Sequence, residues 1–383
     1  MMKNLSLLSL QFFALMFFCW ACREVFEPEV SSLDHNILVV EGYIEVGGGE
    51  TSISLGRTNP VYDSASLSPV LSAAVNIESE GGSSWLLNHL GNGIYSLKDH
   101  IPEDQKYMLR ISTEAGEYWS EWITPIITPE IQEVDFEKNE EGVIIYASTL
   151  GNEDARYFIW DFEETWAYRS AYRAYYRYER NTNQMILLKE EEHAYKCWKS
   201  NNSKRIILAS SEGYQNDHIY QKELLQIADR SEKLGERYSL FVKQKAINRE
   251  AFIFWEAIRK NSDDIGGIFS PLPSLVSSNL YNTNNPEEPV IGHISAGKSA
   301  VKRIFINKSE VEPWRTLIPE YIRCQIFDVP AKEYPNIYWE RFYVPLIPNC
   351  GAPVCPGFLI STTECADCTA RGGFLQKPDF WID

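Results

Sequence analysis

Residues 84–97, SWLLNHLGNGIYSL, contain the pattern from which the fold of this chain can be predicted. Two short apolar runs, Ser84–Leu87 and Ile94–Leu97, stand on either side of the dipeptide Asn92-Gly93. Asn-Gly between such runs favours a tight turn that joins two antiparallel strands. We therefore interpret this stretch as part of an antiparallel sheet.

Short apolar runs of the same kind continue on both sides of it, with turn residues at Gly47–Gly49 and at Gly81-Gly82. The predicted strands are Leu38–Ile44, Thr51–Leu55, Ala74–Glu78, Ser84–Leu87, Ile94–Leu97, Tyr107–Ser112 and Tyr118–Trp122. Seven short strands in so few residues are typical of a β-sandwich. We expect an N-terminal β-sandwich domain over residues 37–125.

A second β pattern follows the stretch Thr124–Pro129, whose two prolines indicate a linker. Its predicted strands are Ile131–Phe136, Val143–Ala147, Tyr157–Tyr168, Arg205–Ala209, Tyr238–Gln244, Val290–Ile294 and Val301–Ile306. This pattern predicts a second, fibronectin-like β domain over residues 126–320. The fold class is therefore mainly β, with two consecutive sandwiches of the immunoglobulin or fibronectin kind.

Two helical insertions are expected within the second domain. His218–Ala228 and Arg249–Lys260 both carry apolar residues at helical spacing, and Asn248 can cap the second helix. Residues 261–284 are rich in Ser, Pro, Asn and Gly and predict loops. Residues 321–383 are expected to be an irregular, cysteine-rich segment packed on the second domain.

The N-terminus has the features of an exported lipoprotein. Lys3 precedes a short apolar run that ends at Trp20, and charged residues follow soon after, which is typical of a signal peptide over residues 1–21. Ala21 directly before Cys22 fits a lipobox, in which the cysteine becomes lipidated. Cys19 is the weaker alternative, because it would place bulky Phe18 where a small residue is required. Residues 22–36 then form a lipidated tether.

The charge of the chain restricts its partners. The chain has 36 Lys and Arg residues and 53 Asp and Glu residues, which gives a net charge of −17. Nucleic acid and anionic lipid headgroups would repel such a surface. We therefore expect no nucleic-acid partner, and contact with the membrane only through the lipid anchor.

Six cysteines remain after the lipobox, namely Cys197, Cys324, Cys350, Cys355, Cys365 and Cys368. An even number in an exported chain favours disulfides, and six cysteines allow 15 pairings, among which the residues do not choose. A zinc ribbon would need two C-x-x-C knuckles, whereas Cys350 and Cys355 are separated by four residues. Disulfides are therefore the favoured interpretation, with no metal.

Sequence motifs of catalysis are missing from the chain. Its six histidines are scattered, and there is no H-E-x-x-H, G-x-S-x-G, P-loop or G-x-G-x-x-G. Glu163 and Glu164 are neighbours on one predicted strand and would point to opposite faces. We expect no enzyme activity, no catalytic residue and no cofactor.

One stretch stands out as a candidate partner-binding surface, because tyrosine and arginine are enriched at interaction hot spots. Its candidate residues are Trp166, Tyr168, Tyr172, Arg173, Tyr175, Tyr176, Arg177 and Tyr178. The alternative is an exposed hairpin whose arginines cover its aromatic rings.

Several stretches together resemble a known family. They are Cys22 with Phe26-Glu27-Pro28, LVVEG at Leu38–Gly42, FEETW at Phe162–Trp166, Cys197-Trp198, Cys365-Ala366-Asp367-Cys368, Arg371-Gly372-Gly373 and Lys377–Trp381. With these motifs the chain resembles the Bacteroidota lipoprotein family of unknown function called domain of unknown function 4249.

The resemblance implies a cellular location and a kind of partner. Such lipoproteins are associated with TonB-dependent receptors, so we expect a non-enzymatic outer-membrane lipoprotein, facing the cell surface, that acts as an accessory or substrate-capture subunit of such a receptor. The alternative is a structural subunit of an outer-membrane assembly or secretion complex. Either partner is an outer-membrane β-barrel protein.

Overall fold

The computed structural model describes residues 36–59, 67–263, 278–337, 342–351 and 354–382. The predicted signal peptide, Cys22 and almost all of the tether lie outside these residues. Within the described ranges, no helix combines the length and the apolar character that a membrane crossing requires. Strands dominate the structure, which confirms the mainly β class.

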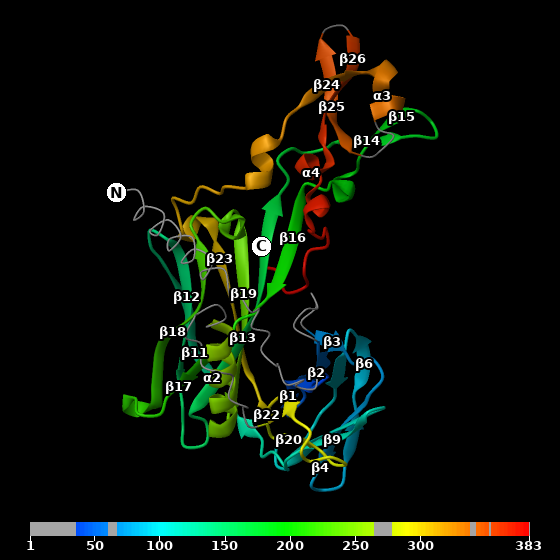
Figure 1. Ribbon diagram of the computed structural model, residues 1–383. Helices are drawn as coiled ribbons and strands as arrows, with labels where there is room; N and C mark the ends of the chain where they lie inside the picture. Colours follow the sequence, from blue (N-terminus) through cyan, green and yellow to red (C-terminus); the bar gives the residue numbers. More distant parts are fainter. Residues whose placement is uncertain (1–35, 60–66, 264–277, 338–341, 352–353, 383) are drawn as a thin grey trace, which may run out of the picture.

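The first sandwich contains two sheets that face each other (Figure 1). Its strands are β1 (Leu38–Glu45), β2 (Glu50–Thr58), β3 (Leu67–Pro69), β4 (Ala74–Ser79), β5 (Ser84–Leu86), β6 (Asn88–Gly91), β7 (Ile94–Lys98), β8 (Tyr107–Thr113), β9 (Gly116–Ser120), β10 (Ile126–Ile127), β20 (Leu280–Asn282), β21 (Val290–Ile291) and β22 (Ser295–Lys298). One sheet has the order β10-β22-β1-β2-β7-β6, with β21 beside β1 and β3 beside β2, and the other has the order β20-β9-β8-β4-β5.

Alternation along the strands builds the core of this sandwich. In β4, Val75 and Ile77 are fully buried while the residues between them are not. They belong to the same cluster as Ile53 and Leu55 of the facing sheet. Burying each such side chain contributes about 1.5–3 kcal/mol.

The predicted boundary of the first domain, residues 37–125, is wrong. Strands β20, β21 and β22 come from residues 280–298, within the range assigned to the second domain, and β1 pairs in parallel with β21 and β22. Parallel strands need a long connection, so nothing near β1 in the sequence signals these partners. The chain enters the second sandwich and then returns to complete the first.

The second sandwich has a three-stranded and a five-stranded sheet. Its strands are β11 (Ile131–Lys138), β12 (Gly142–Leu150), β13 (Tyr157–Arg169), β16 (Lys196–Asn202), β17 (Ile207–Ser210), β18 (His218–Ala228), β19 (Arg237–Ile247) and β23 (Ala300–Asn307). The orders are β11-β12-β18 and β16-β13-β19-β23, with β17 also beside β13. The core between the sheets contains Trp160, whose Nε1 donates to Gln244 Oε1 at 2.9 Å.

The predicted helix His218–Ala228 is wrong, because these residues form strand β18. The pairing of β18 with β12 shifts register twice, and Gln221 has a φ of 48°. A bulge turns the following side chains toward the other face. Ile219, Leu224, Leu225 and Ile227 therefore all reach the core, although their spacing is typical of a helix.

The other predicted helix is confirmed as α2 (Arg249–Asp263). Asn248 caps it, since its Oδ1 accepts a hydrogen bond from the backbone N–H of Ala251 at 2.8 Å. The remaining helices are short: η1 (Glu190–Glu192), η2 (Gln215–Asp217), η3 (Glu232–Leu234), η4 (Lys308–Glu310), η5 (Pro319–Arg323), η6 (Ala331–Glu333), α3 (Tyr334–Ile337), α4 (Thr363–Ala366) and η7 (Cys368–Arg371).

Polar contacts join the two sandwiches. Tyr43 of β1 donates a hydrogen bond to the carbonyl of Ala246 at 3.2 Å, and Glu45 forms an ion pair with Lys243 at 2.9 Å. In the predicted linker, Thr128 Oγ1 accepts from the backbone N–H of Ala246 at 2.9 Å. The linker therefore lies along β19 and includes β10.

A third unit projects away from the sandwiches (Figure 1), and we call it the arm. It consists of β14 (Tyr176–Glu179), β15 (Gln184–Leu187), α3, β24 (Phe327–Pro330), β25 (Tyr343–Gly351) and β26 (Val354–Thr362). Val329, Tyr334 and Ile360 form its small core, against which Tyr178 and Met185 of the β14–β15 hairpin pack.

The arm corrects the expectation that residues 321–383 are irregular. β24, β26 and β25 form an antiparallel sheet, with register shifts in β25 between Pro345 and Ile347 and between Asn349 and Gly351. Prolines and bulges of this kind conceal a strand from pattern analysis. The tail after β26 returns to the second sandwich, and Tyr321, at the start of residues 321–383, donates to the carbonyl of Arg169 in β13 at 2.9 Å.

Candidate functional site

Three disulfides hold the C-terminal part of the chain. Cys197 pairs with Cys368, Cys324 with Cys365, and Cys350 with Cys355. The prediction of disulfides is thus confirmed, and the structure supplies the pairing that the sequence left open. The first bond ties the tail to β16, and the second ties it to the segment that leads into the arm.

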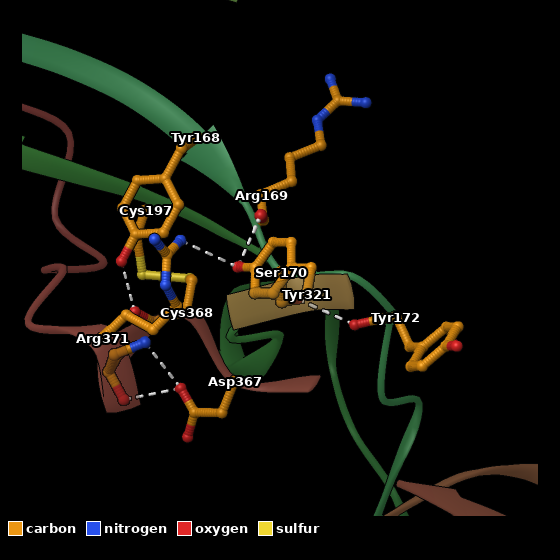
Figure 2. Close-up of a disulfide and its surroundings, with 10 residues drawn as sticks. Tyr168, Arg169, Ser170, Tyr172, Cys197, Tyr321, Asp367, Cys368 and Arg371 are labelled. Atoms are coloured by element: carbon orange, nitrogen blue, oxygen red, sulfur yellow. Dashed lines mark hydrogen bonds between the residues drawn. A yellow bond between two sulfur atoms is a disulfide. The ribbon is translucent and has the colours of Figure 1, made fainter. Parts of the chain in front are cut away.

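Arg371 is the centre of the polar network beside the first disulfide (Figure 2). Its guanidinium contacts Glu232 at 2.8 Å, Glu320 at 3.5 Å and the Tyr321 hydroxyl at 3.2 Å. It also lies over the ring of Tyr168, 5.2 Å from the centroid. Burial disfavours its charge, but hydrogen bonds to Tyr321 and Glu232 raise the pKa of Arg371. This arginine therefore connects three segments of the chain.

The residues around Arg371 allow the tail to approach closely. Asp367 caps η7 through the backbone N–H of Thr369 at 2.8 Å, and Gly372 ends it with a left-handed φ of 79°. A Cβ on Gly373 would lie 2.4 Å from the Tyr168 hydroxyl and 2.7 Å from Cys197 Cβ. Positions 372 and 373 therefore favour glycine for different reasons, the first for its backbone conformation and the second for space.

The last residues dock on the outer face of the second sandwich. Trp381 is buried against Ala167 and Trp198, and Phe305 packs on it edge to face. The guanidinium of Arg303 lies 3.5 Å from the ring centroid of Phe380. The stretch Lys377–Trp381 thus has a structural role here.

Two residues of the predicted Tyr and Arg surface are not on a surface. Trp166 and Tyr168 lie in β13 and are buried in the core of the second sandwich. They stand at the end of a long, continuously paired strand, where both faces are covered. This part of the prediction is wrong.

The remaining six residues run from the end of the sandwich into the arm, and most of them contact other parts of this chain. Tyr172 donates to the carbonyl of Cys324 at 3.1 Å. Tyr176 packs edge to face on Phe358, and Tyr178 on Tyr334. These rings pack inside the arm against other rings, an arrangement that differs from the alternative of arginines covering the rings.

Arg173, Tyr175 and Arg177 are more exposed to solvent than Trp166 and Tyr168. Arg173 pairs with Glu190 at 2.6 Å and lies over the Tyr175 ring. Its Nε donates to His193 Nδ1 at 3.1 Å, and Arg173, Glu190 and His193 line a cleft of about 430 Å³. Arg177 is exposed and lines a cleft of about 500 Å³ between the hairpin and β25. The accessible part of the predicted surface therefore lies at the base of the arm.

Sequence reasoning missed the most exposed apolar residues of the arm. We call Leu187, Ile326, Phe327, Phe342 and Ile347 the arm's apolar set. Leu187 and Phe342 are each 62% exposed. They lie on more than one face of the arm, because Phe327 pairs with Ile360 and Ile347 with Leu359, and these two consecutive residues of β26 point to opposite faces. Four of them lie between Ile326 and Ile347, whereas Leu187 comes from the distant β14–β15 hairpin, which the fold brings onto the same unit.

Comparison with known proteins identifies the family. The family model "Domain of unknown function (DUF4249)" matches residues 23–303. The chain belongs to the DUF4249 family. This confirms the family named from the sequence motifs, and the match covers the first sandwich, the β14–β15 hairpin and the second sandwich as far as the first half of β23.

Other comparisons add little to the DUF4249 assignment. A search of curated proteins found no match. Among solved structures, a two fibronectin type-III domain segment from chicken tenascin is 9% identical, with 55% of this chain and 92% of that chain covered and a TM-score of 0.15. The family match ends at residue 303, so the C-terminal cysteines and the sheet β24–β26–β25 lie beyond it.

In this DUF4249 chain, the described residues hold no group of three or more His, Cys, Asp or Glu side chains that could bind a metal ion. Glu164 is buried and bonds to Lys233 at 2.6 Å and to the Tyr238 hydroxyl at 2.8 Å, whereas Glu163 is on the opposite face of β13. The partners of Glu164 therefore indicate a structural role for this carboxylate.

Proposed function

We propose that this DUF4249 protein is a lipid-anchored, non-enzymatic subunit that binds an outer-membrane TonB-dependent receptor through its arm. The observation that carries the proposal is the arm's apolar set. In a chain with a net charge of −17, five large apolar side chains lie at least two-fifths exposed on one projecting unit. Burying such side chains against a partner is the main source of association free energy.

The way the arm is held also supports a binding role. The Cys324–Cys365 disulfide and the tail stapled by Cys197–Cys368 fix the base of the arm to the second sandwich. Tyr175 and Leu346 add a backbone hydrogen bond of 3.1 Å at this base. A surface that is already ordered loses less conformational entropy on binding.

The anchor and the absence of an enzyme role are argued from the sequence. Cys22 follows Ala21 in a lipobox, and a lipidated cysteine would keep the protein at the outer membrane, next to barrel proteins. The chain carries no nucleophile, metal or phosphate-binding motif. A tethered subunit can act at low intrinsic affinity, because the membrane raises the effective concentration of its partner.

Co-purification tests the proposal. The full-length protein, tagged at its C-terminus, is recovered from gently solubilised membranes, and a TonB-dependent receptor is expected with it. The double variant Leu187→Ser, Phe342→Ser should recover at least about tenfold less receptor, because two apolar contacts are removed. The matched control is Leu90→Ser, Tyr220→Ser, which changes two side chains that are each 66% exposed and lie on the sandwiches.

Two outcomes would contradict the proposal. Recovery of assembly or secretion components in place of the receptor would favour a structural subunit of such a complex. Equal loss of receptor in the arm variant and in the control would mean that the arm is not the binding surface.

Cys22→Ala should release the protein from the membrane. The variant has no cysteine in the lipobox to receive acyl chains, so we expect it in the soluble envelope fraction. Fractionation and metabolic labelling with a radioactive fatty acid measure this. A variant that remains in the membrane, together with a wild-type chain that takes up no label, would show that Cys22 is not the anchor.

A further inference from the structure

A basic pocket lies at the end of the second sandwich that is remote from the arm, where α2 packs beside β17 (Figure 1). The pocket has a volume of about 230 Å³. Four cationic side chains line it, Lys204, Arg205, Lys222 and Arg259, with Glu223 as the one acid among its lining residues. Acids outnumber bases in the chain by 53 to 36, so a concentration of bases here runs against the composition.

The cations come from three elements that are distant in sequence. Lys204 and Arg205 precede β17, Lys222 lies in the bulged part of β18, and Arg259 lies in the last turns of α2. Among the described residues, only Arg259 of the four forms an ion pair, with Glu256 at 3.8 Å. The fold therefore brings four positive charges together, and Lys204, Arg205 and Lys222 form no ion pair with a described residue, although Glu223 lines the same pocket.

Lys222 shows the electrostatic effect of this arrangement. Burial lowers the pKa of its ammonium group, and the charges of Arg259 and Arg205 lower it further, against the opposing effect of Glu223. A bound anion would counteract both effects that lower this pKa. It would offset the charges of Arg259 and Arg205, and it would accept hydrogen bonds from the buried ammonium group. Like charges gathered in one pocket reduce the stability of the fold, so their presence together indicates a ligand.

We infer that Lys204, Arg205, Lys222 and Arg259 form a binding site for the phosphate group of a phosphate monoester. Arginine matches the oxygen geometry of phosphate with two parallel N–H donors, and lysine supplies point charge. The volume of about 230 Å³ is below the roughly 300–1,000 Å³ of small-molecule sites, which suits a phosphate group rather than a large ligand.

A neighbouring cavity offers space for the organic part of the ligand. Lys204 and Arg205 also line an adjoining cavity of about 330 Å³, in the junction between the two sandwiches. Its other walls include the apolar side chains of Ile159, Ile247 and Trp255, and also the carboxylates of Glu41 and Asp161. An ester whose phosphate lies among the four cations would therefore place an apolar or aromatic substituent near Trp255. This site is separate from the arm and does not depend on the receptor proposal.

Calorimetric titration of the purified full chain with inorganic phosphate, at about pH 7.5 and low ionic strength, tests the phosphate site. Binding to the wild type is expected, and Arg205→Gln, Lys222→Met should weaken it at least about tenfold. The control Lys106→Met, Lys332→Met makes the same charge change at two exposed positions away from the pocket. Acetate at the same concentration should bind much more weakly than phosphate, because it carries one charge and two oxygens.

Thermal unfolding provides a second readout that does not need a binding constant. Without phosphate, the Arg205→Gln, Lys222→Met variant should unfold at the same or a higher temperature than the wild type, because like charges are removed. Phosphate should raise the unfolding temperature of the wild type and leave that of the variant unchanged. No binding of phosphate to the wild type, or equal binding to the variant and the wild type, would overturn the inference.

Phenyl phosphate tests the ester part. It should bind the wild type at least about threefold more tightly than inorganic phosphate does, and Trp255→Ala should remove this difference while leaving the affinity for inorganic phosphate unchanged. Equal affinities for both anions in the wild type would limit the site to free phosphate and overturn the assignment of a monoester.

Discussion

Replacing both Cys197 and Cys368 by alanine is expected to lower the free energy of unfolding of the second sandwich and tail by roughly 5 kcal/mol. The two residues are 171 positions apart, so the bond closes a very long loop in the unfolded chain. The conformational entropy that a disulfide removes from the unfolded state increases with loop length. This bond therefore has the largest expected effect of the three.

The other disulfides provide matched controls. The Cys324–Cys365 loop has a separation of 41 and the Cys350–Cys355 loop a separation of 5, which correspond to roughly 4 and 2 kcal/mol. Denaturant unfolding of the three alanine pairs, followed by circular dichroism, should rank them in this order. A Cys350, Cys355 variant that loses as much stability as the Cys197, Cys368 variant would contradict this assignment of the main staple.

Trp160→Ala should lower the free energy of unfolding by about 3–5 kcal/mol. The side chain is fully buried between the sheets of the second sandwich and packs on Phe158. Its loss leaves a cavity and removes the hydrogen bond to Gln244, which is itself fully buried. Gln244 also donates to the carbonyl of Pro129 at 3.0 Å, so the linker should loosen with the core.

Trp122→Ala is the matched control for this prediction, because it removes the same side chain from a position that is 49% exposed. We expect a loss below about 1 kcal/mol there. Thermal denaturation of both variants measures the difference. Similar losses for Trp122→Ala and Trp160→Ala would mean that Trp160 does not form the core as described.

Local patterns predicted much of the fold. Alternating apolar residues and Asn-Gly or Gly-Gly turns indicate strands that correspond to β1, β2, β4, β7 and β8. Asn92-Gly93, however, joins β7 to β6, which the pattern misses, whereas Ser84–Leu86 forms β5 in the other sheet. Helical spacing together with a capping residue indicated α2, and Asn248 is its cap in the structure. These features depend only on neighbours in the sequence. They could be recognised because the spacing of their buried side chains is not interrupted.

Features that depend on distant partners could not be predicted. β21 and β22 pair with β1, from which they are separated by the whole second sandwich except β23. The strand predicted at Val290–Ile294 is therefore present as β21, but in the first sandwich and not in the second. The bulge of β18 breaks the alternation, so its spacing predicts a helix. β25 contains prolines near its register shifts, so its sequence predicts an irregular segment.

The partner-binding role of the candidate surface stays a prediction. Tyr and Arg composition does not separate Trp166 and Tyr168, which are buried, from Arg173 and Arg177, which are accessible. Burial on both faces of β13 depends on the facing sheet β11-β12-β18 and on the tail. The arm's apolar set does not emerge from the sequence, because Leu187 is distant from the other members and the prolines and register shifts of β25 conceal that strand.

Photo-crosslinking in intact cells tests most directly whether the arm binds a receptor. A photoreactive phenylalanine analogue at Phe342, which is 62% exposed, is compared with the same analogue at Tyr220, which is 66% exposed. The account predicts a crosslinked product from position 342 that contains a TonB-dependent receptor, and none from position 220. A receptor product from position 220 alone, or no product from position 342 while the receptor is present, would contradict it.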